Sequence, residues 1–370
     1  MSGLGYLFPA IRLAHILQKR GQQVLFVSTV EHAITLDSCG IAHVAVRNDG
    51  APFLNTAGWY NPGNSVNEVK VFDNVIQQYK PDVIVANPLT LGAFVMAEKY
   101  GIPLINIGFT EYLYPSLNGA DPDKEWRIKS ITDFYNAYRA PLGLAPIACS
   151  AEYSPLIGDK YLLRSVPGLN KGAKLPAKVA CVGGLYWEPA YTNIPLENFI
   201  AETIKSKRPL VYMQIGRLFE AADNWETLTG ILARLPMNFV ADIGRSDYIR
   251  SGTNVPNNFF ADPFIPIGKI AGDIDFVICS GQSTSVISAI VHGKQILSIP
   301  HSADSTELTH KLETNGLAIG VHGRKNITFE VICGAINRLQ HHQLQDKALE
   351  YSRLFDGYTD DHIFDVIDSV

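Results

Sequence analysis

The sequence has few cysteines, a modest share of charged residues and no long apolar run. Its five cysteines (Cys39, Cys149, Cys181, Cys279 and Cys333) stand far apart and form no CxxC pair, so no disulfide framework is indicated. No apolar stretch reaches the roughly 18 residues that suggest a membrane span, and no secretory leader pattern opens the chain. We therefore expect a cytoplasmic protein without a transmembrane segment, and a peripheral membrane contact stays open.

Positive charge is also scarce. The 370 residues include 31 Lys and Arg against 36 Asp and Glu, a net charge of −5, which gives no electrostatic case for nucleic acid as a partner. No histidine pair has HExxH or similar ligand spacing, and we interpret His341 and His342 as solvated surface, so no metal is expected. With 46% hydrophobic residues, the chain is long enough for two domains with separate cores.

What the chain does have is a regular alternation of strand and helix. Pro9 can begin a helix that ends at Gly21, because proline suits a first helical turn and glycine a helix end. Apolar strands are expected at 24–27, 40–46, 81–87, 102–109, 209–216, 238–244, 275–281 and 295–300, with helices between them. Continuous Val, Ile and Leu strands of this kind predict parallel sheets covered on both faces. The fold class is therefore α/β, with two Rossmann-like, doubly wound domains facing a cleft.

The domain boundary is predicted from a shift in composition. After residue 189 the chain is rich in Gly, Pro and Asn, so we place one domain at 1–190, a second at 191–355, and a tail at 356–370 that returns to the first domain. Only Met1 and Ser2 precede the first glycine-containing turn, where a doubly wound sheet normally has its central first strand. We expect that strand to be missing, which would leave its neighbours with unpaired backbone groups.

The stretch DIDFVICSGQSTSVISAIVHGKQILSIPHSAD (273–304) carries the clearest chemistry. A buried strand leads into residues 280–285, which open a helix, and the free N–H groups of a helix start attract anions. Gly281 would allow close approach of a diphosphate, although a plain helix start is an equal alternative at this point. Asp304 could accept hydrogen bonds from sugar hydroxyls, or cap the helix that follows.

Four stretches together resemble a known family: GYLFPAIRLAHILQKRGQQVLFVS, PDVIVAN with AEKYGIPLI, VACVGGLYWEP, and 273–304. They resemble the two-domain GT-B glycosyltransferases that use nucleotide sugars, close to the family 1 UDP-glucosyl and macrolide transferases, over nearly the whole chain. The spacing from Gly281 to Gly293, Pro300 and Asp304 fits the donor motif without a gap. The resemblance implies inverting transfer of a hexose, from a UDP or dTDP sugar to a small apolar acceptor, without metal or other cofactor.

The resemblance also implies an acceptor-binding first domain and a donor-binding second domain. Acceptor contacts would be Phe109, Tyr112 and Trp126, and Tyr6 and Asn87 occupy the positions of the catalytic base and its acidic partner. Donor contacts would be Gly216, Arg217, Phe264, Ile265, Ser280, Gly281, Gln282, Ser283, Thr284, Ser285, Asp304 and Ser305.

Several of these positions depart from the family pattern. Tyr6 replaces the base histidine, and a tyrosine with a pKa of ~10 is a poor base at neutral pH. Asn87 replaces an acid, and Ser280 replaces a phosphate-contacting histidine and brings no positive charge. Further departures are Gln282 for glycine, Ile267 for glutamine, Ser288 for glutamate and Ser305 for glutamine.

Three hypotheses fit these departures. The first is an active enzyme whose base comes from elsewhere, with Glu111, Asp121 or Asp123 as candidates. The second is an acceptor acidic enough to need little base, or a different donor, with Arg217 supplying the missing charge. The third is a catalytically impaired homologue that acts as a binding or accessory protein. A nucleotide-sugar epimerase of the same fold is a weaker alternative.

Overall fold

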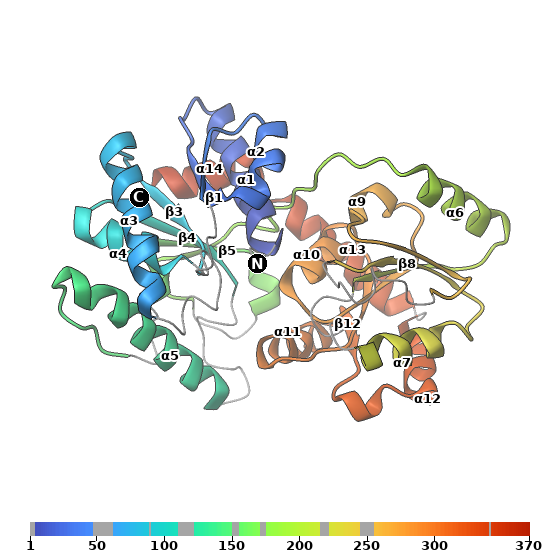
Figure 1. Ribbon diagram of the computed structural model, residues 1–370. Coiled ribbons are helices and arrows are strands. Elements are labelled where there is room, and N and C mark those ends of the chain that lie inside the picture. The colour runs from blue at the N-terminus through green and yellow to red at the C-terminus, as the bar shows by residue number, and fades with distance from the viewer. Residues whose placement is uncertain are drawn as a thin grey trace. The chain divides into compact units, whose positions relative to one another are not determined.

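The computed structural model describes residues 4–46, 62–88, 90–109, 122–149, 155–170, 175–214, 222–244, 255–339 and 342–370. The chain divides into two compact units (Figure 1). The N-terminal unit comprises Met1–Trp187 together with Tyr358–Val370, and the C-terminal unit comprises Glu188–Gly357. Both are α/β structures with parallel sheets, as the sequence predicts. Within the described ranges, no helix is both long and apolar enough to cross a bilayer.

The first helix, α1 (Leu4–Lys19), begins earlier than the sequence predicts and contains Pro9 in its interior. An interior proline removes the hydrogen bond to the carbonyl four residues earlier, here that of Gly5. The guanidinium of Arg164 donates to this carbonyl at 3.2 Å. A distant side chain therefore satisfies the carbonyl that Pro9 leaves open, which explains why Pro9 does not mark the helix start.

The strands of the N-terminal unit form two separate parallel sheets. One contains β1 (Phe26–Thr29) and β2 (His43–Val46), and the other has the order β3-β4-β5-β6. The remaining strands are β3 (Ile84–Ala86), β4 (Leu104–Gly108), β5 (Lys160–Leu163) and β6 (Val179–Cys181). The helices around them are α2 (Ala33–Ser38), α3 (Pro62–Tyr79), α4 (Leu91–Tyr100) and α5 (Pro122–Arg139).

The inner edges of these two sheets border a cavity. Alternate residues of a parallel strand direct their backbone groups to opposite sides. The N–H groups of Phe26 and Ile84 donate to the chain on the side of β2 and of β4. The N–H groups of Val27 and Val85 therefore point the other way, into the cavity between β1 and β3. No strand of the described residues pairs with either inner edge. A cavity of about 660 Å³ is lined by residues 22–28 and 80–87 and by side chains of α1 and α3.

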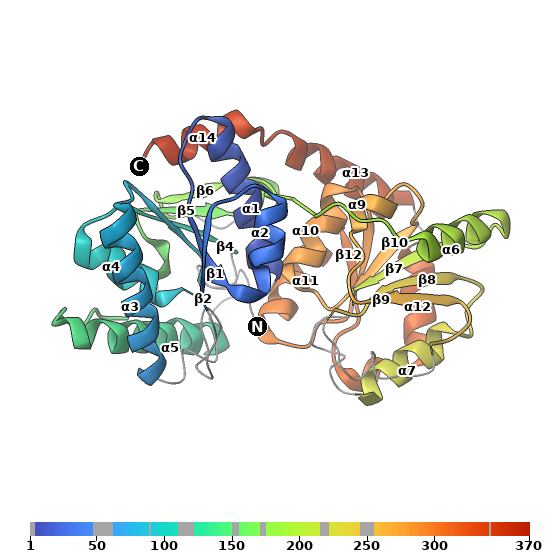
Figure 2. The same cartoon turned by 45° about the horizontal axis from the view of Figure 1, so that its top comes forward.

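The end of the chain belongs to the N-terminal unit. Helix α14 (Asp360–Asp368) lies beside α1 (Figure 2). Ion pairs join Arg12 to Asp360 and Arg20 to Asp361, and the Arg20 guanidinium lies over the Phe364 ring at 5.1 Å. These contacts fix the last helix on the first one.

The C-terminal unit contains one continuous sheet of six parallel strands, in the order β12-β11-β10-β7-β8-β9. Phe239 stacks on Phe259 at 4.6 Å, and Trp225 is buried beside them, which anchors the core on one face. The strands are β7 (Leu210–Gln214), β8 (Asn238–Asp242), β9 (Phe259–Asp262), β10 (Phe276–Cys279), β11 (Gln295–Ser298) and β12 (Ala318–Gly320). The helices are α6 (Ile194–Lys205), α7 (Ala222–Leu232), α9 (Ile267–Ile270), α10 (Ser283–Val291), α11 (Ala303–Thr314), α12 (Phe329–Leu339) and α13 (His342–Asp356).

Candidate functional site

The strand order of the C-terminal sheet locates its most favourable ligand position. From β7 the sheet continues through β8 and β9 on one side, and through β10, β11 and β12 on the other. The order therefore reverses between β7 and β10. Ligands of open α/β sheets bind beyond the carboxyl ends of the strands at such a reversal, and the turn 280–285 follows β10 there.

Gly281 fixes the path of this turn. Its φ is +70°, and a Cβ atom at this position would come within 2.9 Å of the Ser298 hydroxyl and 2.8 Å of the Thr309 hydroxyl. These two hydroxyls are themselves hydrogen bonded at 2.6 Å. Only glycine meets both the conformational and the steric requirement, so the turn packs directly against α11.

The side chain of Ser280 is fully buried, and its hydroxyl has no hydrogen-bond partner in the described part of the chain. A buried polar group without a partner costs about 1–3 kcal/mol, and such groups call for an explanation. The hydroxyl is closed to solvent, so a ligand oxygen beyond the end of β10 would reach it only after a shift of the turn 280–285.

The beginning of α10 offers further donors. Its N-cap residue Gln282 makes no side-chain capping bond, and the helical bonding starts from the Val286 N–H to the Gln282 carbonyl. The N–H groups of Ser283, Thr284 and Ser285 precede this first bond and have no partner among the described residues. Together with the positive end of the helix dipole they form an anion site.

The cap of helix α11 is formed by two serines and not by Asp304. The N-cap is Ser302, and its hydroxyl and that of Ser305 form the capping box. The Ser305 hydroxyl accepts from the N–H groups of His301 at 3.1 Å and Ser302 at 3.0 Å, so Ser305 is occupied by the cap. Asp304 takes no part in capping, and its carboxylate has no partner in the described chain.

The carboxyl ends of β8 and β9 hold a feature that the sequence analysis missed. Asp242 is 4% exposed and accepts a hydrogen bond from the Gly244 N–H at 3.0 Å. It also lies 3.3 Å from the Tyr212 hydroxyl, whose one proton is shared with the Ile265 carbonyl. Burial raises the pKa of Asp242 to about 7, although these hydrogen bonds oppose the shift. The only sequence signal was a single carboxylate in the apolar stretch NFVADIG.

Phe264 and Ile265 follow β9 and differ in exposure. Ile265 is buried, and its carbonyl accepts from the Tyr212 hydroxyl at 2.9 Å. Phe264 is partly exposed and packs edge-to-face on Tyr191 at 6.2 Å. Phe264 can therefore offer an aromatic surface to a ligand, whereas Ile265 positions the backbone. Gly216 and Arg217 lie outside the described residues.

In the N-terminal unit, Tyr6, Asn87 and Phe109 line the same cavity, together with Arg164. The rings of Tyr6 and Phe109 pack edge-to-face at 6.1 Å, and the Arg164 guanidinium lies 4.9 Å from the Phe109 ring centre. Tyr6 and Phe109 are thus in contact, and Asn87 lines the same cavity. Arg164, at the end of β5, was not predicted, because nothing in the sequence distinguishes it from a surface arginine.

Arg164 is the charged group of this cluster. Burial lowers its pKa to about 9, while the interaction with Tyr6 acts in the opposite direction, so the guanidinium is cationic at neutral pH. It also donates to the Gly184 carbonyl at 2.9 Å. At Asn87 the backbone carbonyl accepts from the Thr90 hydroxyl at 2.7 Å, which fixes the turn after β3.

The other predicted acceptor residues are less informative. Trp126, on α5, is 61% exposed and is therefore available at the surface. Glu111, Tyr112 and Asp121 lie outside the described residues, and Asp123 belongs to α5. Tyr135 and Tyr138, also on α5, are buried in the core.

The geometry defines a class of protein: an α/β chain of two units, of which the second presents an uncapped helix start and an unpaired hydroxyl at a topological switch point. No protein-family profile matches the sequence. A glycosyltransferase of PGL/p-HBAD biosynthesis from Mycobacterium tuberculosis is 24% identical over an alignment of 267 positions, which covers 66% of this chain and 60% of that protein. The 4'-demethylrebeccamycin synthase of Lentzea aerocolonigenes is 22% identical over 87% of this chain and 86% of its own.

Solved structures extend this similarity to almost the whole chain. The kitacinnamycin glycosyltransferase has a TM-score of 0.74 at 16% identity, covering 98% of this chain and 94% of its own. VinC in complex with dTDP has a TM-score of 0.69 at 16% identity, covering 99% and 97%. These relatives and neighbours are GT-B glycosyltransferases, consistent with the family 1 resemblance, and the chain has the GT-B fold.

Proposed function

We propose that the chain transfers a hexose from a UDP or dTDP sugar to a hydroxyl of a small, apolar acceptor, with inversion at the anomeric carbon. The C-terminal unit would bind the donor and the N-terminal unit the acceptor. The observation that carries this proposal is the uncapped start of α10, next to the unpaired Ser280 hydroxyl. Two neighbours of the same fold, VinC and the spinosyn rhamnosyltransferase SpnG, were solved in complex with thymidine diphosphate (dTDP). This favours a pyrimidine nucleotide.

Each donor contact has a defined task. The N–H groups of Ser283, Thr284 and Ser285 would bind the diphosphate oxygens and stabilise the charge that develops on the leaving group. Ser280 would donate one further hydrogen bond. The free carboxylate of Asp304 would accept from sugar hydroxyls and so orient the hexose for in-line attack.

The acceptor hydroxyl needs a group that removes its proton. Tyr6 occupies the position of the family base, and the cationic Arg164 beside it would stabilise a phenolate, the form able to accept a proton. Phe109 and Trp126 would contact the apolar part of the acceptor. No metal or organic cofactor is required by this scheme.

A calorimetric titration with UDP, dTDP, GDP and their sugars tests the donor site. We expect saturable binding of one pyrimidine nucleotide, weakened about 10–100-fold by Ser280→Ala, the range for a hydrogen bond to a charged group. Asp304→Ala should weaken binding of the nucleotide sugar but not of the free nucleotide. A folded chain that binds none of these ligands would contradict the proposal and favour a binding or accessory protein.

Product formation separates the enzyme from an impaired homologue. The substitution of Tyr6 for the family histidine is the specific feature that favours impairment. If the donor binds and Tyr6→Phe abolishes transfer to a phenolic acceptor, Tyr6 takes part in the reaction. If the donor binds and no acceptor of a broad panel is glycosylated, the accessory function replaces the catalytic one.

A further inference from the structure

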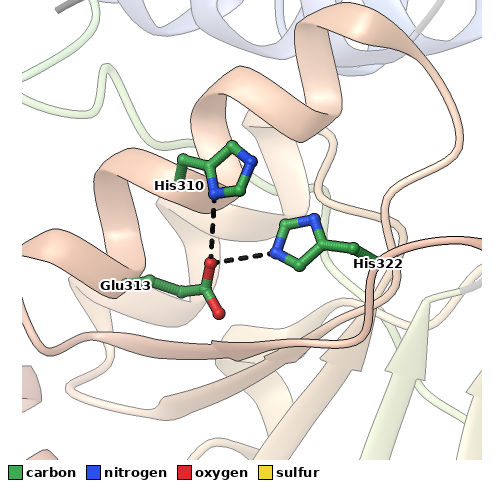
Figure 3. Close-up of side chains that lie close together, drawn as sticks. All are labelled: His310, Glu313 and His322. Atoms are coloured by element: carbon green, nitrogen blue, oxygen red, sulfur yellow. Dashed lines mark hydrogen bonds and ion pairs between the residues drawn. The ribbon is translucent and has the colours of Figure 1, made fainter. Parts of the chain in front are cut away.

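Three side chains outside the proposed donor site converge near the end of the C-terminal sheet. His310 and Glu313 lie one turn apart on α11, and His322 follows β12 (Figure 3). Glu313 Oε2 lies 3.4 Å from His310 Nδ1 and 2.9 Å from His322 Nε2. Among the described residues, these are the three metal-ligating side chains whose ligand atoms all lie within 4.8 Å of one another.

The position of Glu313 is fixed by the backbone of β12. Its second oxygen, Oε1, accepts a hydrogen bond from the Gly320 N–H at 2.8 Å. Partners of this kind orient metal ligands and are typical of built sites. A Cβ atom at Gly320 would come within 2.4 Å of His322 Nε2 and 2.7 Å of Glu313 Oε1, so a larger residue at 320 would displace two of the three ligand atoms.

The charge of the cluster suits a cation. The carboxylate of Glu313 supplies an anionic oxygen ligand, and each of the two imidazoles can supply a nitrogen ligand. The ammonium of Lys311, on the same helix, lies 3.7 Å from the carboxylate of Glu307.

We propose that His310, Glu313 and His322 bind a divalent transition-metal ion of the Zn²⁺ type. Ligand bonds of about 2.0–2.1 Å in a tetrahedron separate ligand atoms by about 3.3 Å, and the distances of 2.9 and 3.4 Å lie on either side of this value. Two imidazoles and one carboxylate favour Zn²⁺ over Mg²⁺ or Ca²⁺, which take oxygen ligands. The proposal departs from the sequence-based expectation of no metal.

Metal binding requires one local rearrangement. The rings of His310 and His322 now stack with centres 4.4 Å apart and an interplanar angle of 12°. Their lone pairs meet at one ion only when the rings turn out of the stack. His310 is exposed, so it is free to make this turn.

The ion would connect α11 to the segment that follows β12. Helix α11 also carries Asp304 at its first turn, so the metal would stabilise the helix that bears the proposed sugar contact. A ligand that binds only the folded state raises the unfolding temperature with its concentration. The site lies further along the helix and takes no part in the proposed transfer, so its test is independent of enzymatic activity.

Titration of metal-free protein with Co²⁺ tests the proposal, because tetrahedral Co²⁺ shows characteristic visible absorption. We expect saturation at one equivalent, displacement of Co²⁺ by Zn²⁺, and a higher unfolding temperature with Zn²⁺. His322→Gln and Glu313→Gln should abolish the absorption. Gly320→Ala retains all three ligands, displaces only flexible side-chain ends, and should weaken binding about 10–100-fold, as loss of a supporting contact does.

His362→Gln is the matched control, because His362 is an exposed histidine of the other unit. It should leave binding unchanged. Absence of saturable binding to the unmodified protein would overturn the proposal, whatever the stability of the variants. So would binding that persists in both His322→Gln and Glu313→Gln.

Discussion

The two units share one pattern of alternating strands and helices, yet their sheets differ in continuity. In the C-terminal unit every residue of β10 is buried between β7 and β11, and burial raises the pKa of Cys279 to about 12. In the N-terminal unit β1 and β3 each lack a partner on one side in the described chain, and Val85 is 36% exposed. The alternation of strand and helix segments therefore predicts which residues form strands, but not whether each strand is paired on both sides.

The largest expected difference is in core truncation. Phe239→Ala removes a fully buried ring from the continuous sheet and should cost about 3–5 kcal/mol of unfolding free energy. Val27→Ala removes two methyl groups beside a cavity that already exists, and should cost less than about 1 kcal/mol, because few contacts are lost. Denaturant unfolding followed by tryptophan fluorescence measures both. Similar losses at the two positions would show that the surroundings of Val27 are packed as tightly as the core of the C-terminal unit.

The second difference concerns a buried charge. The pKa of Asp242 in the folded state, about 7, lies above the usual value of 3.8. Between these values the folded state holds more protons than the unfolded state, so stability falls as the pH rises from about 4 to 7.

Asp242→Asn removes this titration while it keeps an acceptor for the Gly244 N–H. The stability of the variant relative to the parent chain should therefore rise between about pH 4 and 7, on top of a pH-independent cost for the amide NH2 that faces the Ile265 N–H. Unfolding curves at pH 4.5, 6 and 8 provide the measurement. A difference independent of pH would contradict the assigned ionisation.

A smaller loss of stability, with a specific loss of binding, is expected at Gly281. The substitution Gly281→Ala strains a φ of +70° and brings a Cβ atom against Ser298 and Thr309, at a cost of about 1–3 kcal/mol. Because the turn must shift, nucleotide binding should fall as well. Gly230→Ala is the control in the same unit, since a Cβ atom added there would meet no atom within 4 Å. If Gly281→Ala retains nucleotide binding, the turn 280–285 is not part of the donor site.

Much of the C-terminal unit could be predicted from the sequence, because its signals are local. The strand into 280–285, the helix start and Gly281 follow one another along the chain, and their spacing fits one motif. The use of Ser305 rather than Asp304 in the cap was not predictable, since either residue can serve at a helix start and the choice depends on side-chain rotamers.

The features that were missed depend on contacts between distant residues. Arg164 bonds the carbonyl of Gly5, 159 residues away along the chain, and this contact is also why the helix extends before Pro9. His322 meets Glu313 because β12 returns the chain to α11, and their separation of nine residues matches none of the short ligand spacings that sequence motifs use. Such pairs are set by topology, and no local pattern records them.

The smallest expected effect is local and leaves global stability unchanged. The N–H groups of Val27 and Val85 point into the cavity between β1 and β3, where no strand of the described residues accepts them. Val277, in contrast, lies in β10, which is hydrogen bonded to a strand on each side. Exchange of an amide depends on the free energy of opening its hydrogen bond. Residue-resolved hydrogen exchange should therefore show the amides of Val27 and Val85 exchanging at least about tenfold faster than that of Val277, a difference of about 1.4 kcal/mol. Equal protection would mean that the inner edges of β1 and β3 are paired in solution, and the contrast between the two sheets would then disappear.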